Sequence, residues 1–412
     1  MRILFVNAYF MPETIAFSHL EKDLIESLVS AGHEIDVICP TPTRNVSEEV
    51  CEKYKGIKTE ELYHGRVHIR RFFAPREGKN PLVRALRYLW CNLREYQIGK
   101  QYQDIDTVFA VSTPPTQGLL AGKLGKKLKC PFIYSLQDIF PDSLATTGLS
   151  KENSIMWRVG RKIEDCTYQG ADTIIVISED FKQNIMAKGV PEEKIVIVPN
   201  WVNTEHVHPI PREENVMFDR YQLERNRYYI SYSGNIGHSQ NMDLLLRAAK
   251  VLKNTMPDVT FVLVGEGAAK EDIAQRIADE KLDNVIMLPF QPEEDIAHVF
   301  SFADADLVIS KPGVGGSSVP SKTWGIMASG RPLLASFDSN SELVRIVRAV
   351  KCGLCSEADD LDAFITSIRR LHDDRAWAEA MGRCGREYVC RELSKDVCTA
   401  MYEDVLRTAA NR

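Results

Sequence analysis

The segment between residues 311 and 330 has the composition of an anion-binding loop that leads into a short helix. It reads KPGVGGSSVPSKTWGIMASG and follows a short apolar run, residues 306–310, that is typical of a buried strand. Glycines allow backbone N–H groups to approach a ligand closely, and a helix N-terminus offers free N–H groups and a partial positive charge. The segment therefore predicts a seat for a phosphate or diphosphate, while an ordinary loop and helix cap would use the same residues. The predicted contacts are Gly316, Ser317, Ser318, Ser321 and Lys322.

A second glycine-rich segment, residues 233–237 with the sequence SGNIG, follows another predicted strand. Gly234, Asn235 and Gly237 could direct backbone groups at the same ligand, and two converging loops suit a diphosphate. Neither the first strand nor the GEG sequence at residues 265–267 provides the complete G-x-G-x-x-G pattern of dinucleotide-binding folds. The sequence therefore argues against a dinucleotide-dependent oxidoreductase.

Polar side chains that could act on an acceptor hydroxyl follow a strand in the first half of the chain. Residues 132–136 form an apolar run, and Gln137 and Asp138 come directly after it. Asp138 could orient or deprotonate a hydroxyl, and Gln137 could hydrogen-bond a sugar or a departing phosphate oxygen. An Asx turn or helix cap before Pro141 is the alternative interpretation of Asp138.

The loop after the first predicted strand contains a further carboxylate candidate, Glu13, next to Pro12. A solvated carboxylate in the first turn of a helix would have the same position. His19 lies on the helix that follows, where a surface or core role without chemistry is the alternative. We treat Pro12, Glu13 and His19 as candidates for the acceptor side.

Basic and aromatic residues are interleaved between residues 70 and 100. The apolar residues that recur there at helical spacing are Val83, Leu86, Trp90 and Leu93. The arginines that fall largely outside this face are Arg84, Arg87 and Arg94. Such a helix suits an anionic membrane or an anionic lipid headgroup, which would place Arg84 and Arg87 on the acceptor side. A helix that packs on its own domain would show the same pattern, and RNA binding is a more remote alternative.

Composition narrows the class of protein. The 412 residues are 44% hydrophobic and 26% charged, which is typical of a globular chain with two domains. A net charge of -6 argues against a general nucleic-acid binder. The ten cysteines lack framework spacing, and Cys352 and Cys355 form a C-x-x-C without a second pair, so we predict a cytoplasmic location and no metal site. No window has the roughly 18 consecutive apolar residues of a membrane span, so any membrane contact is expected to be peripheral, on the inner face of the cell membrane.

Short apolar runs alternate with helical patterns, and this alternation predicts parallel sheets with crossover helices. The ten runs are residues 3–6, 35–39, 107–111, 132–136, 173–177, 229–233, 260–264, 285–288, 307–310 and 332–335. We predict an α/β fold of two doubly wound, Rossmann-like domains that face each other across a cleft lined by the carboxyl ends of their strands. The predicted boundaries are 1–203, a linker at 204–226, 227–390, and a C-terminal helix at 391–412 that could pack back on the first domain.

Together these segments resemble the retaining family-4 glycosyltransferases of the two-domain GT-B fold, and within them the WbuB-like branch of bacterial surface-polysaccharide enzymes. The resemblance spans nearly the whole chain. The motifs that carry it are PE at residues 12–13, STPP at 112–115, QDIFP at 137–141, PNWVN at 199–203, GNIG at 234–237, GEG at 265–267, PSK at 320–322 and MASGRP at 327–332.

The resemblance implies that the second domain binds a nucleotide-sugar donor with its base near Phe290, and that the first domain binds the acceptor. We expect transfer, with retention at the anomeric carbon, from a UDP-sugar of the N-acetylhexosamine type to a lipid-linked acceptor in surface-glycan assembly. Lys322 and backbone N–H groups would stabilise the leaving diphosphate, while Gln137 and Asp138 would position the acceptor hydroxyl. No cofactor is expected besides the donor, which is a co-substrate.

The sequence departs from the family pattern at three places. Asn235 and Gln240 stand where many members have an arginine and a lysine. Lys322 and backbone dipoles are therefore expected to neutralise more of the diphosphate charge. Ser317 and Gly325 stand where a pair of glutamates is expected, and Gln137 replaces a histidine. Two alternatives therefore stay open: a nucleotide-sugar epimerase or hydrolase, and a noncatalytic nucleotide-sugar-binding subunit.

Overall fold

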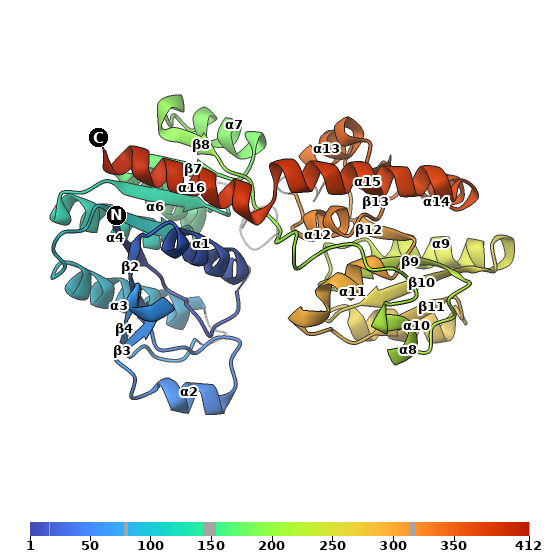
Figure 1. Ribbon diagram of the computed structural model, residues 1–412, viewed down its shortest axis with the longest axis horizontal. Coiled ribbons are helices and arrows are strands. Elements are labelled where there is room, and N and C mark those ends of the chain that lie inside the picture. Colours follow the sequence, from blue (N-terminus) through green and yellow to red (C-terminus); the bar gives the residue numbers. More distant parts are fainter. Residues whose placement is uncertain (16, 78–80, 143–153, 314–318, 412) are drawn as a thin grey trace. The chain divides into compact units, whose positions relative to one another are not determined.

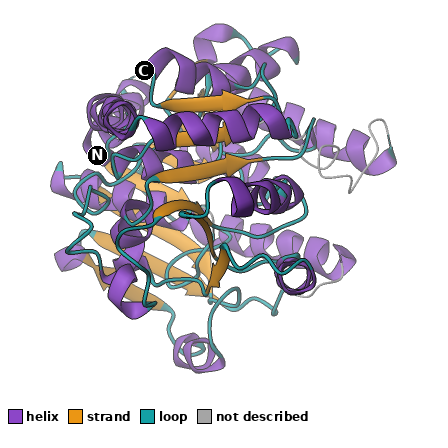
Figure 2. Cartoon of the chain, turned by 90° about the vertical axis from the view of Figure 1, so that its right-hand side faces the viewer, coloured by secondary structure: helices purple, strands orange, loops and turns teal. Residues whose placement is uncertain are grey.

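The computed structural model describes residues 1–15, 17–77, 81–142, 154–313 and 319–411. The chain forms two compact units (Figure 1): Met1–Asn200 together with Asp396–Arg412, and Trp201–Lys395. Each unit is built around one sheet, and helices flank the strands on both sides (Figure 2). This is the doubly wound α/β architecture that the alternation of apolar runs predicts.

The described part of the first unit contains an eight-stranded sheet of order β3-β4-β2-β1-β5-β6-β7-β8. Its strands are β1 (Arg2–Val6), β2 (Glu34–Pro40), β3 (Thr59–Leu62), β4 (Val67–Phe72), β5 (Thr107–Val111), β6 (Phe132–Leu136), β7 (Thr173–Val176) and β8 (Ile195–Ile197). Neighbouring strands pair in parallel except β3, which pairs antiparallel with β4. The strand order reverses between β1 and β5, and ligands of open α/β sheets bind at the carboxyl ends of the strands at such a switch point.

Apolar helix faces cover this sheet. The helices are α1 (Ser18–Ser30), α2 (Glu48–Tyr54), α3 (Pro81–Gly99), α4 (Gln117–Leu128), α6 (Ile155–Gly170), α7 (Glu179–Ala187) and α16 (Lys395–Ala410). In α1, Leu20, Leu24 and Leu28 are buried, as their spacing predicts.

Helix α16 belongs to the first unit although the chain reaches it only after the second unit. The hydroxyl of Tyr402 lies 2.9 Å from Ser135 Oγ on β6, and His33 Nε2 lies 3.1 Å from Glu403 Oε1. Tyr402 is fully buried. These polar contacts across a buried interface attach the C-terminal helix to β6 and to the segment that follows α1.

The described part of the second unit contains a six-stranded parallel sheet of order β11-β10-β9-β12-β13-β14. Its strands are β9 (Tyr228–Ser233), β10 (Val259–Val264), β11 (Val285–Leu288), β12 (Ala305–Ile309), β13 (Leu333–Ser336) and β14 (Gly353–Ser356). Its helices are α8 (Val216–Arg220), α9 (Met242–Thr255), α10 (Lys270–Asp279), α11 (Ile296–Ser301), α12 (Lys322–Ala328), α13 (Glu342–Val350), α14 (Leu361–Asp373) and α15 (Arg375–Glu392). The switch point of this sheet lies between β9 and β12.

Residues 204–226, predicted as a linker, are packed into the second unit. Met217 and Phe218 of α8 are buried in an apolar cluster. Arg386 of α15 donates hydrogen bonds to the carbonyls of Val207 (2.8 Å) and Thr204 (2.9 Å). Residues 204–226 therefore belong to the second unit.

Candidate active site

Two glycine-containing loops pack against each other beside the switch point of the second sheet. Gly234 follows β9, and Gly265 and Gly267 follow β10. A Cβ on Gly265 (φ +153°) would lie 1.9 Å from the Gly234 carbonyl oxygen, and one on Gly267 (φ +157°) would lie 2.3 Å from that of Ile236. The Ile236 N–H donates to the Glu266 carbonyl at 2.8 Å. Only glycine permits this approach of backbone to backbone, so the GEG sequence shapes the loop after β9.

Lys322, the first residue of α12, reaches the same switch point. Its Nζ lies 3.5 Å from the centre of the Tyr232 ring on β9, and 3.7 Å from the position of a Cβ on Gly234. The side chain as a whole is half-buried, but Nζ is buried and has no hydrogen-bond partner among the described residues. A cation–π contact replaces only part of the lost hydration. The site therefore holds a lysine Nζ that has no hydrogen-bond partner among the described residues, beside a glycine-rich loop.

Asp306 on β12 is the buried carboxyl that acts on this lysine. It is 1% exposed, and Ser231 on β9 donates a hydrogen bond to it. Burial raises the pKa of Asp306 to about 7, against the opposing effects of Ser231, Arg331 and Lys322. Burial likewise lowers the pKa of Lys322 to about 7, against the attraction of Asp306. Burial therefore disfavours the charged form of each group, while the attraction between them favours both charged forms.

In the first unit, Gln137 and Asp138 follow β6 as predicted, and they have different environments. Ser112 Oγ accepts hydrogen bonds from the backbone N–H groups of Gln137 (3.0 Å) and Asp138 (3.2 Å), which ties this loop to the end of β5. The Gln137 side chain donates to Ser135 Oγ at 3.1 Å and accepts from Asn200 Nδ2 at 2.8 Å. Asp138 is exposed. Gln137 is therefore held inside the unit, while the Asp138 carboxyl lies at the surface.

Glu13 is a buried carboxyl that holds two loops together. It is 2% exposed, and its Oε1 accepts hydrogen bonds from the backbone N–H groups of Thr43 and Arg44, both at 2.8 Å. Burial raises the pKa of Glu13, and these backbone hydrogen bonds oppose the rise. The neighbouring Pro12 is half-buried, and His19 is exposed in the first turn of α1. Glu13 thus fixes the loop after β2 onto the loop after β1, and the solvated alternative does not describe it.

Two family profiles match consecutive parts of the chain. The profile described as Glycosyltransferase Family 4 matches residues 22–206, and the one described as Glycosyl transferases group 1 matches residues 214–388. The chain belongs to the GT-B glycosyltransferases.

Similar proteins cover from about half to nearly all of this glycosyltransferase. It is 23% identical to the putative colanic acid biosynthesis glycosyl transferase WcaI of Escherichia coli K12, over 96% of this chain and 100% of WcaI. It is 24% identical to the UDP-Gal:alpha-D-GlcNAc-diphosphoundecaprenol alpha-1,3-galactosyltransferase of Escherichia coli, over 49% of this chain and 51% of that protein. The structure of Anabaena HepE in complex with UDP matches with a TM-score of 0.73 and 14% identity, over 99% of this chain and 100% of HepE. At that identity the likeness shows the fold.

Other predicted donor contacts of the glycosyltransferase have mixed environments. Gly237, predicted to direct its N–H at the ligand, donates it to Gln240 Oε1 at 3.1 Å, so Gln240 stabilises the loop from within. Asn235 is exposed, and so is Ser321 directly before α12. Phe290, which follows β11, is 70% exposed, so its aromatic ring is accessible from solvent. The remaining predicted contacts, Gly316, Ser317 and Ser318, lie outside the described residues.

Gly325, where the family pattern expects a glutamate, has a packing role in α12. A Cβ on Gly325 would lie 2.6 Å from a ring carbon of Phe300 on α11. A glutamate at this position would have to displace the Phe300 ring from the core. The departure from the family pattern therefore has a structural reason, and glutamate cannot be restored there without repacking α11.

Arg84 and Arg87 of α3, predicted to lie together on the acceptor side, differ in exposure. Arg84 Nε lies 2.9 Å from Glu77 Oε1, and the Arg84 side chain is 45% exposed. Arg87 is 2% exposed and donates hydrogen bonds to the Pro75 carbonyl (2.9 Å) and to Thr43 Oγ1 (3.1 Å). Arg87 is thus a buried residue that fastens loops to α3, and it does not belong to a membrane-facing surface.

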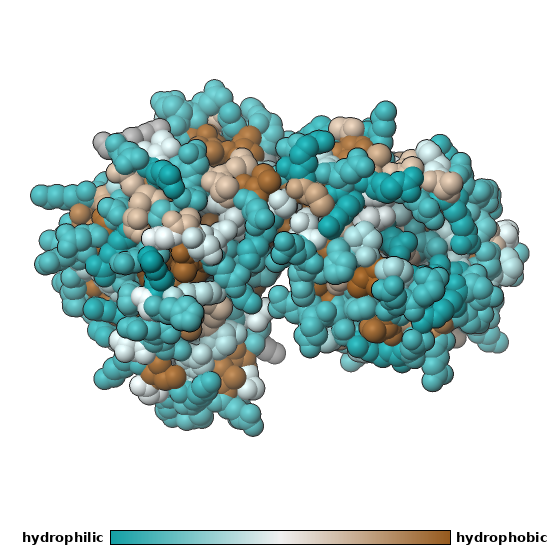
Figure 3. Space-filling model, viewed as in Figure 1, coloured by the Kyte–Doolittle hydropathy of each residue, from teal (hydrophilic) through white to brown (hydrophobic). Residues whose placement is uncertain are grey.

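The apolar face of α3 is exposed. Its exposed side chains are Val83, Leu86, Leu89, Trp90 and Leu93, and we call them the α3 apolar surface. Trp90 Nε1 donates to the Phe73 carbonyl at 3.1 Å, and the Phe73 side chain is also exposed. The view in Figure 3 shows a mainly hydrophilic molecule with separate hydrophobic areas. Contiguous apolar surface of this kind marks an interaction site. Among the described residues, no helix combines the length and hydrophobicity that a membrane crossing requires.

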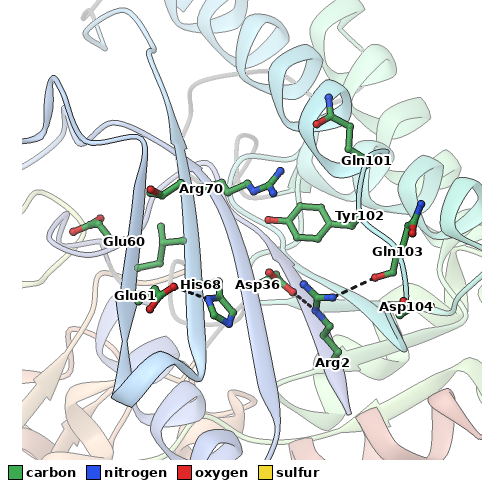
Figure 4. A pocket seen from close by; sticks show the side chains of 12 residues that line it. Arg2, Asp36, Glu60, Glu61, His68, Arg70, Gln101, Tyr102, Gln103 and Asp104 are labelled. Atoms are coloured by element: carbon green, nitrogen blue, oxygen red, sulfur yellow. Dashed lines mark hydrogen bonds and ion pairs between the residues drawn. The ribbon is translucent and has the colours of Figure 1, made fainter.

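A pocket of about 660 Å³ lies at the amino end of β1 in the first unit (Figure 4). Arg2 at the start of β1 donates through Nε to Asp36 Oδ2 at 2.7 Å, and Arg70 lies 4.9 Å from the centre of the Tyr102 ring. His68 Nδ1 lies 3.6 Å from Glu61 Oε1. These charged side chains therefore contact other side chains of the pocket. They lie at the amino end of β1, away from the carboxyl ends of the strands that carry the predicted site residues.

Proposed function

We propose that this glycosyltransferase transfers a sugar of the N-acetylhexosamine type from its UDP donor to a lipid-linked acceptor in bacterial surface-glycan assembly, with retention at the anomeric carbon. The observation that carries the proposal is the buried Lys322 Nζ, which has no hydrogen-bond partner among the described residues and lies beside the glycine loop at the switch point of the second sheet. The UDP complex of HepE, the colanic acid role in the name of WcaI and the diphosphoundecaprenol acceptor of the galactosyltransferase support it. We assign the chain to the WbuB-like branch on its motifs.

The donor chemistry follows from charge. Departure of UDP develops negative charge on the diphosphate, and a preorganised cation in a water-poor site stabilises that charge most. Lys322 supplies the cation, the loop after β9 supplies backbone groups, and Phe290 offers a face for the uracil ring. The reaction proposed here uses the donor as co-substrate and takes no further cofactor or metal.

The acceptor chemistry uses the exposed carboxyl after β6. Asp138 orients the acceptor hydroxyl, and Gln137 acts indirectly by fixing the loop through Ser135 and Asn200. The α3 apolar surface suits a lipid chain or the lipid of the inner membrane face. Arg84 and Arg44, which both approach Glu77, suit the anionic headgroup. The enzyme would then act in the cytoplasm, peripherally bound to the membrane.

Thermal unfolding with UDP, GDP, ADP, NAD and a panel of UDP-sugars tests the donor. A ligand at about 100 times its dissociation constant adds roughly 2.7 kcal/mol of stability. We expect stabilisation by UDP and one UDP-sugar, which then serves in acceptor screens. Stabilisation by GDP or ADP without any by UDP would refute the donor. Turnover of the UDP-sugar without an acceptor would favour the epimerase or hydrolase, and binding without turnover would favour the noncatalytic subunit.

We expect the affinity for a UDP-sugar to fall as the pH rises above about 7. The pKa values of Asp306 and Lys322 are both about 7, and each proton that the pair loses makes its net charge more negative by one, whichever group releases it. The diphosphate diester keeps its charge throughout, so repulsion grows. Calorimetric titration should show a Kd that rises by up to about tenfold per pH unit above neutrality. Lys322→Gln should move this dependence to higher pH, because Asp306 then titrates alone and without the lysine that lowers its pKa. A pH-independent wild-type Kd would contradict the assignment.

We expect the protein to float with liposomes that contain anionic lipid, through the α3 apolar surface. Replacing Leu86, Leu89 and Leu93 together by serine should abolish flotation without lowering the Tm, because these side chains are exposed in the folded protein. Reversing the charge of Arg84 and Arg94 should weaken flotation at low salt. Arg87 is left unchanged because it is buried. A wild-type protein that stays with the soluble fraction would refute the membrane contact.

A further inference from the structure

A small pocket lies at the switch point of the first sheet. Its lining includes Asn7 and Tyr9 from the loop after β1, Thr113 from the loop after β5, and Ser18 and Glu21 from α1. The free space is about 10 Å³, roughly the volume of one water-sized group. The pocket can therefore admit a single hydroxyl at the place where a doubly wound sheet binds its ligand.

Glu21 is the ionisable group of this pocket. It is 7% exposed, and Asn7 Nδ2 donates to its Oε1 at 2.6 Å. Among the described residues this is the only hydrogen bond of the Glu21 carboxyl, and no cationic side chain pairs with it. Burial raises the pKa of Glu21 to about 8, which favours the protonated carboxyl, a hydrogen-bond donor, near neutral pH. A buried carboxyl with one partner has hydrogen-bonding capacity left for a ligand.

The surroundings of the pocket suit an acceptor that carries an anionic group. Tyr9, which lines the pocket, has the guanidinium groups of Arg44 and Arg87 at 5.2 and 5.5 Å from its ring centre. The Arg44 side chain is 40% exposed. Arg44 Nη1 also lies 3.7 Å from the Glu77 carboxylate, so a phosphate on the bound sugar would share or replace this ion pair.

We propose that the Asn7–Glu21 pocket binds one hydroxyl of the acceptor sugar and that Glu21 is its hydrogen-bond partner. This inference rests on the proposed function and adds the residue that recognises the acceptor. The competing explanation is structural, namely that Glu21 only ties α1 to the loop after β1 through Asn7. The two explanations predict different effects of a Glu21 substitution on the acceptor KM.

The test compares Glu21→Ala with Glu21→Gln, using N-acetylglucosaminyl and N-acetylgalactosaminyl diphosphates on short polyprenyl chains as acceptor probes. Glu21→Ala should raise the acceptor KM by about tenfold or more and leave the donor Kd unchanged, because a buried hydrogen bond to the acceptor is lost. Glu21→Gln keeps a neutral donor of the same shape and should stay within about threefold of wild type. Glu95→Ala is the matched control, because Glu95 of α3 is also buried, also bonded by amides and not part of the pocket. It should lower the Tm without raising the acceptor KM.

An acceptor KM unchanged by Glu21→Ala would overturn the inference, and so would equal losses in Glu21→Ala and Glu21→Gln that follow the Tm. A wild-type protein that binds UDP but glycosylates neither probe would contradict the proposed lipid-linked acceptor, and this inference with it. Failure to bind UDP would instead refute the donor.

Discussion

Lys322→Ala should lower kcat/KM for sugar transfer by about 100- to 1,000-fold, because the variant lacks the cation that stabilises the leaving diphosphate. The Nζ group is buried without a hydrogen-bond partner among the described residues, so its removal relieves a desolvation cost that the attraction of Asp306 only partly offsets. The Tm of the free protein should therefore be unchanged or raised. Initial rates at varied UDP-sugar concentration, with thermal unfolding alongside, measure both effects.

Lys250→Ala is the matched control for Lys322→Ala. Lys250 lies on α9 of the same unit, is exposed, and pairs with Glu280 at 3.2 Å. This surface pair contributes little to stability, and the variant should retain nearly full activity. If Lys322→Ala turns over like wild type, Lys322 has no part in the mechanism. A loss of activity accompanied by an equal loss of the folded state would indicate a structural role instead.

Gly265→Ala should destabilise the second unit by about 3 kcal/mol or more and abolish UDP binding. The added Cβ would lie 1.9 Å from the Gly234 carbonyl oxygen, in a backbone conformation that L residues rarely adopt. Relief of this clash requires the loop after β9 to shift from its present position beside Lys322. Calorimetric unfolding measures the stability, and titration with UDP at a temperature where the variant remains folded measures the site.

Gly313→Ala separates conformational strain from the clash. Gly313 also has a positive φ, +76°, but a Cβ there would meet no atom of the described residues within 4 Å. Strain alone should cost about 1 kcal/mol. If Gly265→Ala behaves like Gly313→Ala, then the two loops can separate cheaply and the GEG sequence does not shape the donor site.

Periodicity in the sequence was sufficient to identify most strands of the two sheets. Each of the ten apolar runs forms a strand, because a parallel strand buried on both faces must be continuously apolar. The strands missed are β3, β4, β8 and β14. In β4 the charges hide the strand, since Arg71 is buried by pairing with Glu60 from β3. An ion pair between strands leaves no local pattern.

The candidate site likewise contains residues that local sequence indicated and residues that it did not. Glycine-rich strand exits and a lysine at a helix start are local features, so the sequence alone indicated Gly234 and Lys322. The burial of Arg87 and Glu21 depends on acceptors and donors that other segments bring to them: Pro75 and Thr43 for Arg87, and Asn7 for Glu21. By itself the sequence determined which segments form strands and helices and which residue types stand at their ends. Only the tertiary structure decided which charged side chains are buried, because the energy of a buried charge is set by partners distant in the chain.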